Sequence, residues 1–322
     1  DFRSALANRG SDVKSRGEAI YKLVLQPVVE ALEGSGAHHV IWSTDGVLRY
    51  IPLAAIWDGR RYLIEHENLE FTLYNPLELQ SLTSPVGNPQ MAAFAAPDGA
   101  PPRFSALRGA EAELKAVVKD NLHGLHGVVP GYGLERQNFN RTTFLDAIRD
   151  RESNVLHIAS HFVVSGKSLD SELLLGKGGT ITLREILGAE QNRFGHLELI
   201  CLSACNTATP GEGAGGGEVD SFLGLALDQG AKAVIASLWS ISDDSTPVLM
   251  RRFYEEWRAH PDLGKAHALK AAQLAMLRGQ IGPSGSSDAN RASNAARPVP
   301  GSFVKFEHPY FWAPFILFGN WR

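Results

Sequence analysis

An α/β fold with a mostly parallel central sheet is predicted by two features of this sequence. From residue 91 onward, short runs rich in Val, Ile and Leu alternate with stretches of helical periodicity, which is typical of buried parallel strands and their crossover helices. Two of these runs, 154–162 and 197–207, break into small and polar residues, as a buried strand does where it reaches the edge of its sheet. These two strand ends carry His161 and Cys205.

Composition and charge limit the classes of protein to consider. The chain has 322 residues, of which 44% are hydrophobic and 20% charged, so it can bury the core of one large or two ordinary domains. A net charge of -4 and a pI near 6.3 show no basic footprint for nucleic acid or a membrane surface. No apolar run reaches the roughly 18 residues of a membrane span, and no signal peptide opens the chain. We expect no direct nucleic-acid or membrane partner.

The only two cysteines are Cys201 and Cys205. At positions i and i+4 of one strand they lie roughly 13 Å apart, beyond the reach of a disulfide. Reduced thiols favour the cytoplasm as the location. Because the chain begins at Asp1 without Met, we expect it to be a piece of a longer protein.

The first 90 residues are expected to form a small β-rich lobe behind an N-terminal helix. The apolar spacing predicts a helix over 12–33, stopped by Gly34. This helix is followed by a strand at 38–43, a hairpin turn at Asp45-Gly46 and a returning strand at 48–56. A turn at Asp58-Gly59 and a half-buried strand at 69–73 come next.

Residues 91–322 are expected to form the main domain, with helices on both faces of the sheet. The pattern predicts strands at 91–96, 127–129, 154–162, 197–207, 232–239 and 310–318. Helices are predicted at 109–120, 140–149, 218–229 and 263–280, with a further one capped by Ser245. A hairpin at 172–183 and a linker at 281–302 complete the domain.

The strongest chemical candidate is the pair formed by His161 and Cys205. In open α/β sheets, ligands bind outside the carboxyl ends of the strands, and both residues stand at such ends. A Cys thiolate is a strong nucleophile, and a neighbouring His can take its proton and return it to a leaving amine. This pairing suits peptide cleavage. The structural alternative is that both are packing residues, since free Cys is among the most buried residue types.

Two motifs suggest other chemistry and are set aside. His157 and His161 with Cys201 and Cys205 offer a Cys₂His₂ set, but residues at i and i+4 of a strand are too far apart to share one tetrahedral zinc ion. His157 and Cys201 are therefore expected in the sheet core, and no metal or cofactor is expected. Residues 211–216 fit G-x-G-x-x-G, yet they lack the tight strand-to-helix turn of a dinucleotide site. We interpret them as a flexible loop.

Six ordered segments resemble the CHAT family, a branch of the caspase-like peptidases that also resembles separase. They are Tyr50-Ile51-Pro52-Leu53-Ala54-Ala55, Leu107-Arg108-Gly109-Ala110-Glu111-Ala112-Glu113, Leu156-His157-Ile158-Ala159-Ser160-His161, Leu202-Ser203-Ala204-Cys205-Asn206-Thr207, the run 230–239 and the ending 308–315. The resemblance covers nearly the whole chain. It implies a caspase-like αβα sandwich and peptide hydrolysis without a cofactor.

The resemblance also implies roles for individual residues. Cys205 is the expected nucleophile and His161 its general acid and base, while the backbone N–H groups of Phe162 and Cys205 are expected to form the oxyanion hole. The chain departs from the family at two positions. Phe162 stands where the family usually has Gly after the His, and Asn206 replaces the usual acidic residue after the Cys. Phe162 lacks the conformational freedom of glycine.

The expected substrate is a protein, and Trp239, Asp243 and Asp244 are the expected substrate-binding residues. The acidic pair has two interpretations: a turn entering the helix at Ser245, or a pocket lining that favours a basic side chain before the cleaved bond. A regulatory module or partner protein, such as helical repeats, is expected to switch the enzyme on. The alternative function is a catalytically silent interaction module, which Phe162 favours. A third class, a nucleotide-dependent oxidoreductase, predicts a retained cofactor.

Overall fold

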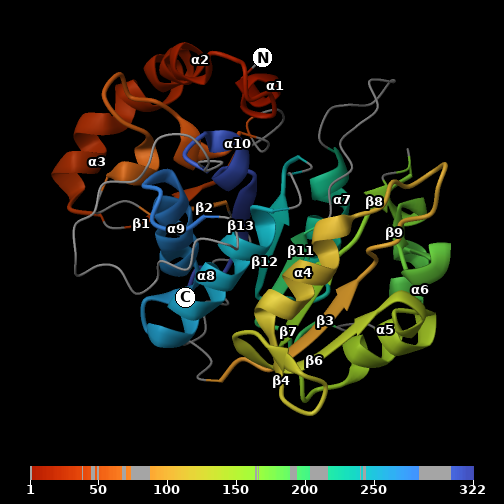
Figure 1. Ribbon diagram of the computed structural model, residues 1–322. Helices are drawn as coiled ribbons and strands as arrows, with labels where there is room; N and C mark the ends of the chain where they lie inside the picture. The colour runs from red at the N-terminus through yellow and green to blue at the C-terminus, as the bar shows by residue number, and fades with distance from the viewer. Residues whose placement is uncertain are drawn as a thin grey trace, which may run out of the picture.

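The computed structural model describes residues 2–37, 39–44, 48, 51–66, 70–73, 88–163, 165, 167–188, 194–203, 217–239, 241, 244–282 and 306–322 (Figure 1). Within these ranges the centre is one ten-stranded sheet with the order β1-β2-β13-β12-β11-β7-β3-β6-β4-β5. Its strands are β1 (His39–Trp42), β2 (Glu70–Leu73), β3 (Met91–Ala95), β4 (Val118–Asp120), β5 (Leu125–His126), β6 (Val129–Glu135), β7 (Val155–Ala159), β11 (Leu199–Ser203), β12 (Ala233–Ser237) and β13 (Phe315–Gly319). Neighbouring strands are parallel except β12 with β13 and β4 with β5. The predicted mostly parallel sheet is confirmed.

Helices cover both faces of this sheet. The helices concerned are α4 (Arg108–Val117), α5 (Arg141–Arg149), α7 (Gly217–Asp228), α8 (Thr246–Ala259) and α9 (Gly264–Leu277). The chain steps outward from β3 to β6 through α4 and steps back from β6 to β7 through α5. Right-handed crossovers therefore place α4 and α5 on opposite faces. Helix α8 packs against both α4 and α9, so these three form one layer. The step from β11 to β12 through α7 runs in the same direction along the sheet as the step from β6 to β7 through α5, which places α7 on the same face as α5. The predicted αβα sandwich is confirmed.

A second, small antiparallel sheet follows β7. Its strands are β8 (Phe162–Val163), β9 (Glu172–Leu174) and β10 (Thr180–Thr182), in the order β10-β9-β8. The hairpin predicted at 172–183 is therefore confirmed, and the short helix α6 (Leu183–Leu187) follows it, capped by Thr182. This sheet begins directly after His161 and fixes how the chain leaves the end of β7.

The predicted helix at 12–33 is wrong as a single helix. The structure has α2 (Val13–Ile20), a π turn at Tyr21–Leu25, a 3-10 turn at Gln26–Val28 and α3 (Val29–Ser35). Pro27 has no N–H to donate to the preceding turn, and this forces the irregular hydrogen bonding around it. The helix ends at Gly36, which adopts the left-handed conformation, rather than at Gly34.

The hairpin predicted after β1 is also wrong. Strand β1 pairs in parallel with β2, and β2 continues the main sheet next to β13. Where a returning strand was predicted, Leu53–Ala55 forms a 3-10 turn after Pro52, whose missing N–H removes a ladder donor. The turn predicted at Asp45-Gly46 lies outside the described residues. Because β1 and β2 complete the central sheet, the N-terminal 90 residues share it with the rest of the chain.

Several predicted boundaries in the main domain also differ. Helix α4 ends at Val117, and the three residues after it form β4. The strand predicted at 127–129 begins only at Val129 and runs to Glu135. The strand predicted at 310–318 begins at Phe315, because Pro309 starts the short helix α10 (Pro309–Trp312). Proline is well tolerated in a first helical turn and cannot donate within a strand.

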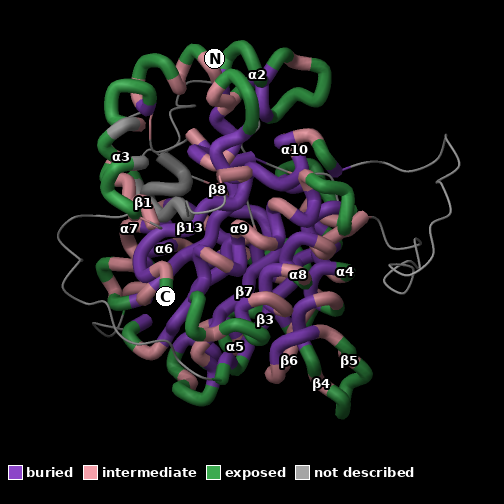
Figure 2. Tube along the Cα trace, turned by 90° about the vertical axis from the view of Figure 1, so that its left-hand side faces the viewer, coloured by how far each residue is buried: buried purple, intermediate pink, exposed green. Residues whose placement is uncertain are grey.

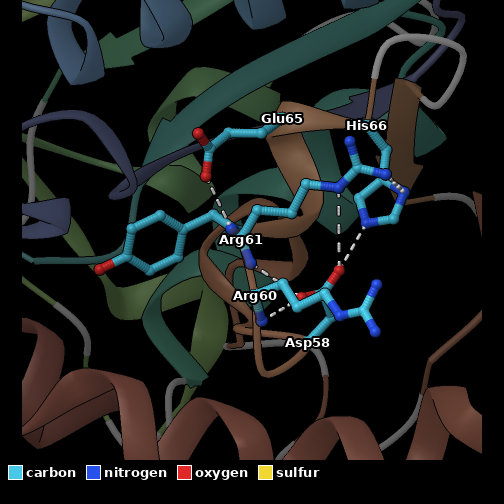
Figure 3. A network of polar contacts seen from close by, with 6 residues as sticks. Asp58, Arg60, Arg61, Glu65 and His66 are labelled. Carbon is cyan, nitrogen blue, oxygen red and sulfur yellow. Dashed lines mark hydrogen bonds and ion pairs between the residues drawn. The ribbon is translucent and has the colours of Figure 1, made fainter.

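The turn predicted at Asp58-Gly59 is confirmed and is held by a polar network (Figure 3). One carboxylate oxygen of Asp58 accepts hydrogen bonds from the backbone N–H groups of Arg60 and Arg61. The other oxygen lies 2.8 Å from Nε2 of His66, and Glu65 accepts from the N–H of Tyr62. These local hydrogen bonds hold the turn in place, although no long strand flanks it.

The buried residues run through the central strands and the α8 and α9 layer, whereas the outer turns of α2 and α3 face solvent (Figure 2). Helix α1 (Phe2–Leu6) is short but buries Phe2 and Leu6. Among the helices in the described part of the chain, none combines the length and the apolar character needed to cross a membrane.

Candidate active site

The strands that lead to the two candidate residues are neighbours in the sheet. Strands β7 and β11 are parallel neighbours, and their last residues, Ala159 and Ser203, are partners in the register. His161 follows Ala159 by two residues and Cys205 follows Ser203 by two. Neighbouring strands lie about 4.8 Å apart, so the chain leads toward both candidate residues from adjacent positions at the carboxyl end of the sheet. Cys205 itself lies outside the described residues.

His161 is held in one orientation by the backbone. The residue is only 4% exposed, and Nε2 lies 2.7 Å from the carbonyl oxygen of Ser105. A carbonyl oxygen only accepts, so Nε2 carries the proton and Nδ1 keeps the lone pair in the neutral ring. Burial lowers the pKa of His161 below its ordinary 6.5, although the bond to Ser105 opposes part of this shift. The ring is therefore neutral near pH 7 and able to accept a proton at Nδ1.

The loop between β3 and α4 presents the Ser105 carbonyl. Its backbone folds back on itself through a bridge between Ala100 and Phe104, and the ring of Phe104 lies 5.5 Å from that of His161. Gly99 has a φ of 63°, and a Cβ at this position would lie 2.3 Å from the Ser105 oxygen. Glycine is needed here because any side chain would displace the acceptor that orients His161.

Phe162 adopts an ordinary strand conformation in place of the family glycine. Within the described residues, the non-glycine residues with positive φ are Arg136 and Lys177, so Phe162 needs no glycine-like backbone. Phe162 pairs with Leu173, and the adjacent Leu174 N–H donates to the His161 carbonyl. In an antiparallel ladder this pattern directs the N–H of Phe162 away from β9. The Phe162 ring packs against Phe222, with ring centroids 5.6 Å apart.

His157 and Cys201 are core residues, as predicted. Both have 0% exposure, and they are partners in the register of β7 and β11. Nδ1 of His157 lies 3.0 Å from the Tyr254 hydroxyl, and Nε2 lies 3.0 Å from Oε1 of Glu113. Among the residues that the structure describes, no group of three or more His, Cys, Asp or Glu side chains is arranged to hold a metal ion.

The sequence interpretation missed that His157 belongs to a buried polar network. Glu113 is 3% exposed, and its second oxygen, Oε2, accepts a hydrogen bond of 3.0 Å from the hydroxyl of Ser203. A signal for this network is present in the sequence. Ala110, Leu114 and Val117 form the buried face of α4, and Glu113 falls on the same helical face at i+3 from Ala110. A carboxylate in an apolar stripe indicates a buried partner.

The expected substrate-binding residues are only partly described. Trp239 follows β12, is 3% exposed, and donates from its indole N–H to the carbonyl of Tyr310 at 3.1 Å. Asp244 is exposed and precedes Ser245, the N-cap position of α8, whose side chain makes no capping bond. Asp243 and the glycine-rich motif at 211–216 lie outside the described residues. A role for Trp239, Asp243 and Asp244 in substrate binding stays a prediction.

The fold and the position of His161 define a caspase-like protease-fold domain. The chain matches the model of the CHAT domain over residues 14–320 and belongs to that family. The search of curated proteins found no match.

Several solved structures are similar to this chain. The complex of the Porphyromonas gingivalis RgpB pro- and mature domains has a TM-score of 0.51 at 11% identity, covering 100% of this chain and 75% of that one. The Arg specific cysteine proteinase gingipain R (RgpB) has a TM-score of 0.44 at 10% identity, with 80% and 55% coverage. The Saccharomyces cerevisiae separase–securin complex has 0.46 at 12% identity, with 88% and 15% coverage. The chain thus spans about half of the gingipain R chain.

Proposed function

We propose that this domain is a cysteine endopeptidase that cleaves protein substrates with a Cys205–His161 dyad. One observation carries the proposal: the register that pairs Ala159 with Ser203, two residues before each member of the dyad. The bond between His161 and the Ser105 carbonyl adds to it, because that bond leaves Nδ1 as the basic atom. Membership of the CHAT family supports the same class of reaction.

The proposed reaction uses two half-reactions. His161 takes the thiol proton through Nδ1, and the sulfur of Cys205 attacks the carbonyl carbon of the peptide bond. The backbone N–H groups of Phe162 and Cys205 stabilise the resulting oxyanion. His161 then gives its proton to the leaving amine, and the C–N bond breaks to leave a thioester. Water attacks the thioester with His161 as base, which releases the acid and restores the thiol.

The proposed substrate has Arg or Lys before the cleaved bond. The gingipain R structure is of an Arg specific cysteine proteinase, and Asp243 and Asp244 follow the strand next to that of the nucleophile. A carboxylate in a pocket needs a cationic partner. A cleavage preference for Leu, Met or Asp would return the two aspartates to a turn at the start of α8.

Labelling with peptide electrophiles tests the dyad and the specificity together. We expect a peptide chloromethyl ketone that ends in Arg or Lys to modify Cys205, located by peptide mass spectrometry. His161→Ala should slow this labelling by about 10²-fold or more, because the thiol loses its proton acceptor. The buried Cys201 should stay unlabelled and serves as the internal control. Labelling of Cys205 at the same rate in His161→Ala would favour the silent interaction module.

We also propose that a partner module switches the protease on through the N-terminal helix. Arg3 in α1 donates a hydrogen bond of 2.6 Å to the carbonyl of Leu238, the residue before Trp239. Arg9 stacks over the rings of Tyr310 and Phe311 at 4.6 and 4.5 Å. The N-terminal segment thus contacts Leu238, the residue before Trp239, and Tyr310, whose carbonyl accepts from the Trp239 indole. A partner that moves this segment, such as a helical-repeat protein, would act on the expected substrate-binding residue Trp239.

Arg3→Ala tests this switch. We expect the variant to change the rate of Cys205 labelling by the peptide electrophile several-fold. Labelling by iodoacetamide, which does not depend on the substrate-binding residues, should stay the same. Arg16→Ala, an exposed arginine on the neighbouring helix α2, is the matched control. Equal peptide-labelling rates in wild type and Arg3→Ala would remove the basis for the switch.

A further inference from the structure

The buried polar network links the two strands of the dyad to two helices. Glu113 on α4 contacts His157 on β7 and Ser203 on β11, each at 3.0 Å. Tyr254 on α8 contacts the other nitrogen of His157, also at 3.0 Å. One carboxylate therefore joins the strand that leads to His161 with the strand that leads to Cys205.

Burying this polar network between the sheet and the helices α4 and α8 costs folding free energy. A buried carboxylate and imidazole lose their hydration, and apolar side chains of similar volume often stabilise a core equally well or better. His157 has 0% exposure and Glu113 only 3%, and both oxygens of the carboxylate have partners. Buried polar groups with complete partners fix geometry, because any shift leaves a buried group without its bond.

The network lies close in sequence to both members of the proposed dyad. Ser203 is the last residue of β11, and Cys205 follows after two residues. Two residues of extended chain span at most about 7 Å, so the place of Ser203 limits the place of the nucleophile. His157 lies four residues before His161, on the strand paired with β11. Through His157 and Ser203, Glu113 thus contacts the two strands that lead to the members of the dyad.

We infer that Glu113 is a positioning residue of the active site, which holds Ser203 against β7 and so places Cys205 opposite His161. The inference rests on the proposed dyad. Glu113 touches no substrate in this role and acts through Ser203. The hydroxyl of Ser203 is the specific link, because it is the only described contact of the network on β11 that lies within two residues of Cys205.

The experiment compares Ser203→Ala, Ser203→Thr and His161→Ala with wild type. The rate at which iodoacetamide alkylates Cys205 is measured from pH 5 to 9 by peptide mass spectrometry, alongside kcat and KM for a cleaved peptide. A free thiol reacts with an apparent pKa near 8.5, and a His-paired thiol reacts well below that. Ser203→Ala should move the profile toward that of His161→Ala and lower kcat by about 10- to 100-fold with little change in KM. Ser203→Thr keeps the hydroxyl and should behave as wild type.

The outcomes separate this inference from the proposed function. A wild-type profile equal to that of His161→Ala would remove the dyad, and the inference with it. A dyad-dependent wild-type profile that Ser203→Ala leaves unchanged would overturn the inference alone. Equal shifts in Ser203→Ala and Ser203→Thr would also count against it, because the hydroxyl would not be the cause. Glu113→Gln keeps the side-chain shape but cannot accept from both partners, and it should shift the profile in the same direction as Ser203→Ala.

Discussion

Replacing Cys205 by alanine is expected to lower kcat for peptide cleavage by about 10⁴-fold or more, the scale seen when a nucleophile is removed from a catalytic unit. In the proposed mechanism the sulfur atom forms the covalent intermediate, and alanine has no atom that can attack. Members of such a unit act together, so His161→Ala should cost a comparable factor and the double variant little more. The measurement is kcat for all three variants, with a peptide substrate whose sequence is chosen from the labelling experiment.

Cys201→Ala is the matched control for the loss of a thiol. Cys201 is fully buried, and its sulfur lies 3.6 Å from that of Met250, so the variant should lose some stability while kcat stays within about twofold of wild type. Retention of cleavage by Cys205→Ala would show that the nucleophile lies elsewhere. Loss of activity in Cys201→Ala at unchanged stability would point to a metal or redox role for that residue.

Glu113→Ala is expected to reduce the free energy of unfolding by about 3–5 kcal/mol, the cost of leaving one partner of a buried pair alone. The variant strips His157 of its charged partner and Ser203 of its acceptor. Glu111→Ala is the control on the same helix: Glu111 is partly exposed and pairs with Lys115 and Arg136 at the surface, where a pair contributes at most about 1 kcal/mol. Urea unfolding at pH 7 measures both. Equal losses in the two variants would contradict a buried ion pair.

The same pair predicts a dependence of stability on pH. Burial by itself lowers the pKa of His157, but the neighbouring Cys201 and the Glu113 carboxylate outweigh it and raise the pKa from 6.5 to about 10. A histidine with a raised folded pKa contributes stability that is fully present below the unfolded value of 6.5 and is lost as pH rises through the folded value. The difference in stability between wild type and Glu113→Ala should therefore shrink as pH rises toward 10.

The sequence determined the central strands, the αβα class, the family and the identity of the candidate dyad. Buried parallel strands are continuous apolar runs, and such runs are visible in one dimension wherever both faces of a sheet are covered. The polar ends at His161 and Cys205 were equally visible, because a strand changes composition where it leaves the core. The sequence also placed His157 and Cys201 inside the sheet from their spacing alone.

Only the tertiary structure decided which strands pair and which buried groups meet. Strand β1 looked like half of a local hairpin, yet it pairs with β2 and completes the main sheet, because edge pairing depends on the sheet already formed by distant residues. The members of the buried polar network are separated by up to 141 positions in the sequence: Glu113, His157, Ser203 and Tyr254. No local sequence pattern predicts that their side chains meet. The acceptor for His161 is a backbone carbonyl at Ser105, which has no residue-type signature at all. Local chemistry therefore identified the candidate side chains, whereas the long-range packing of α4 and α8 on the sheet decided which buried groups meet beneath them.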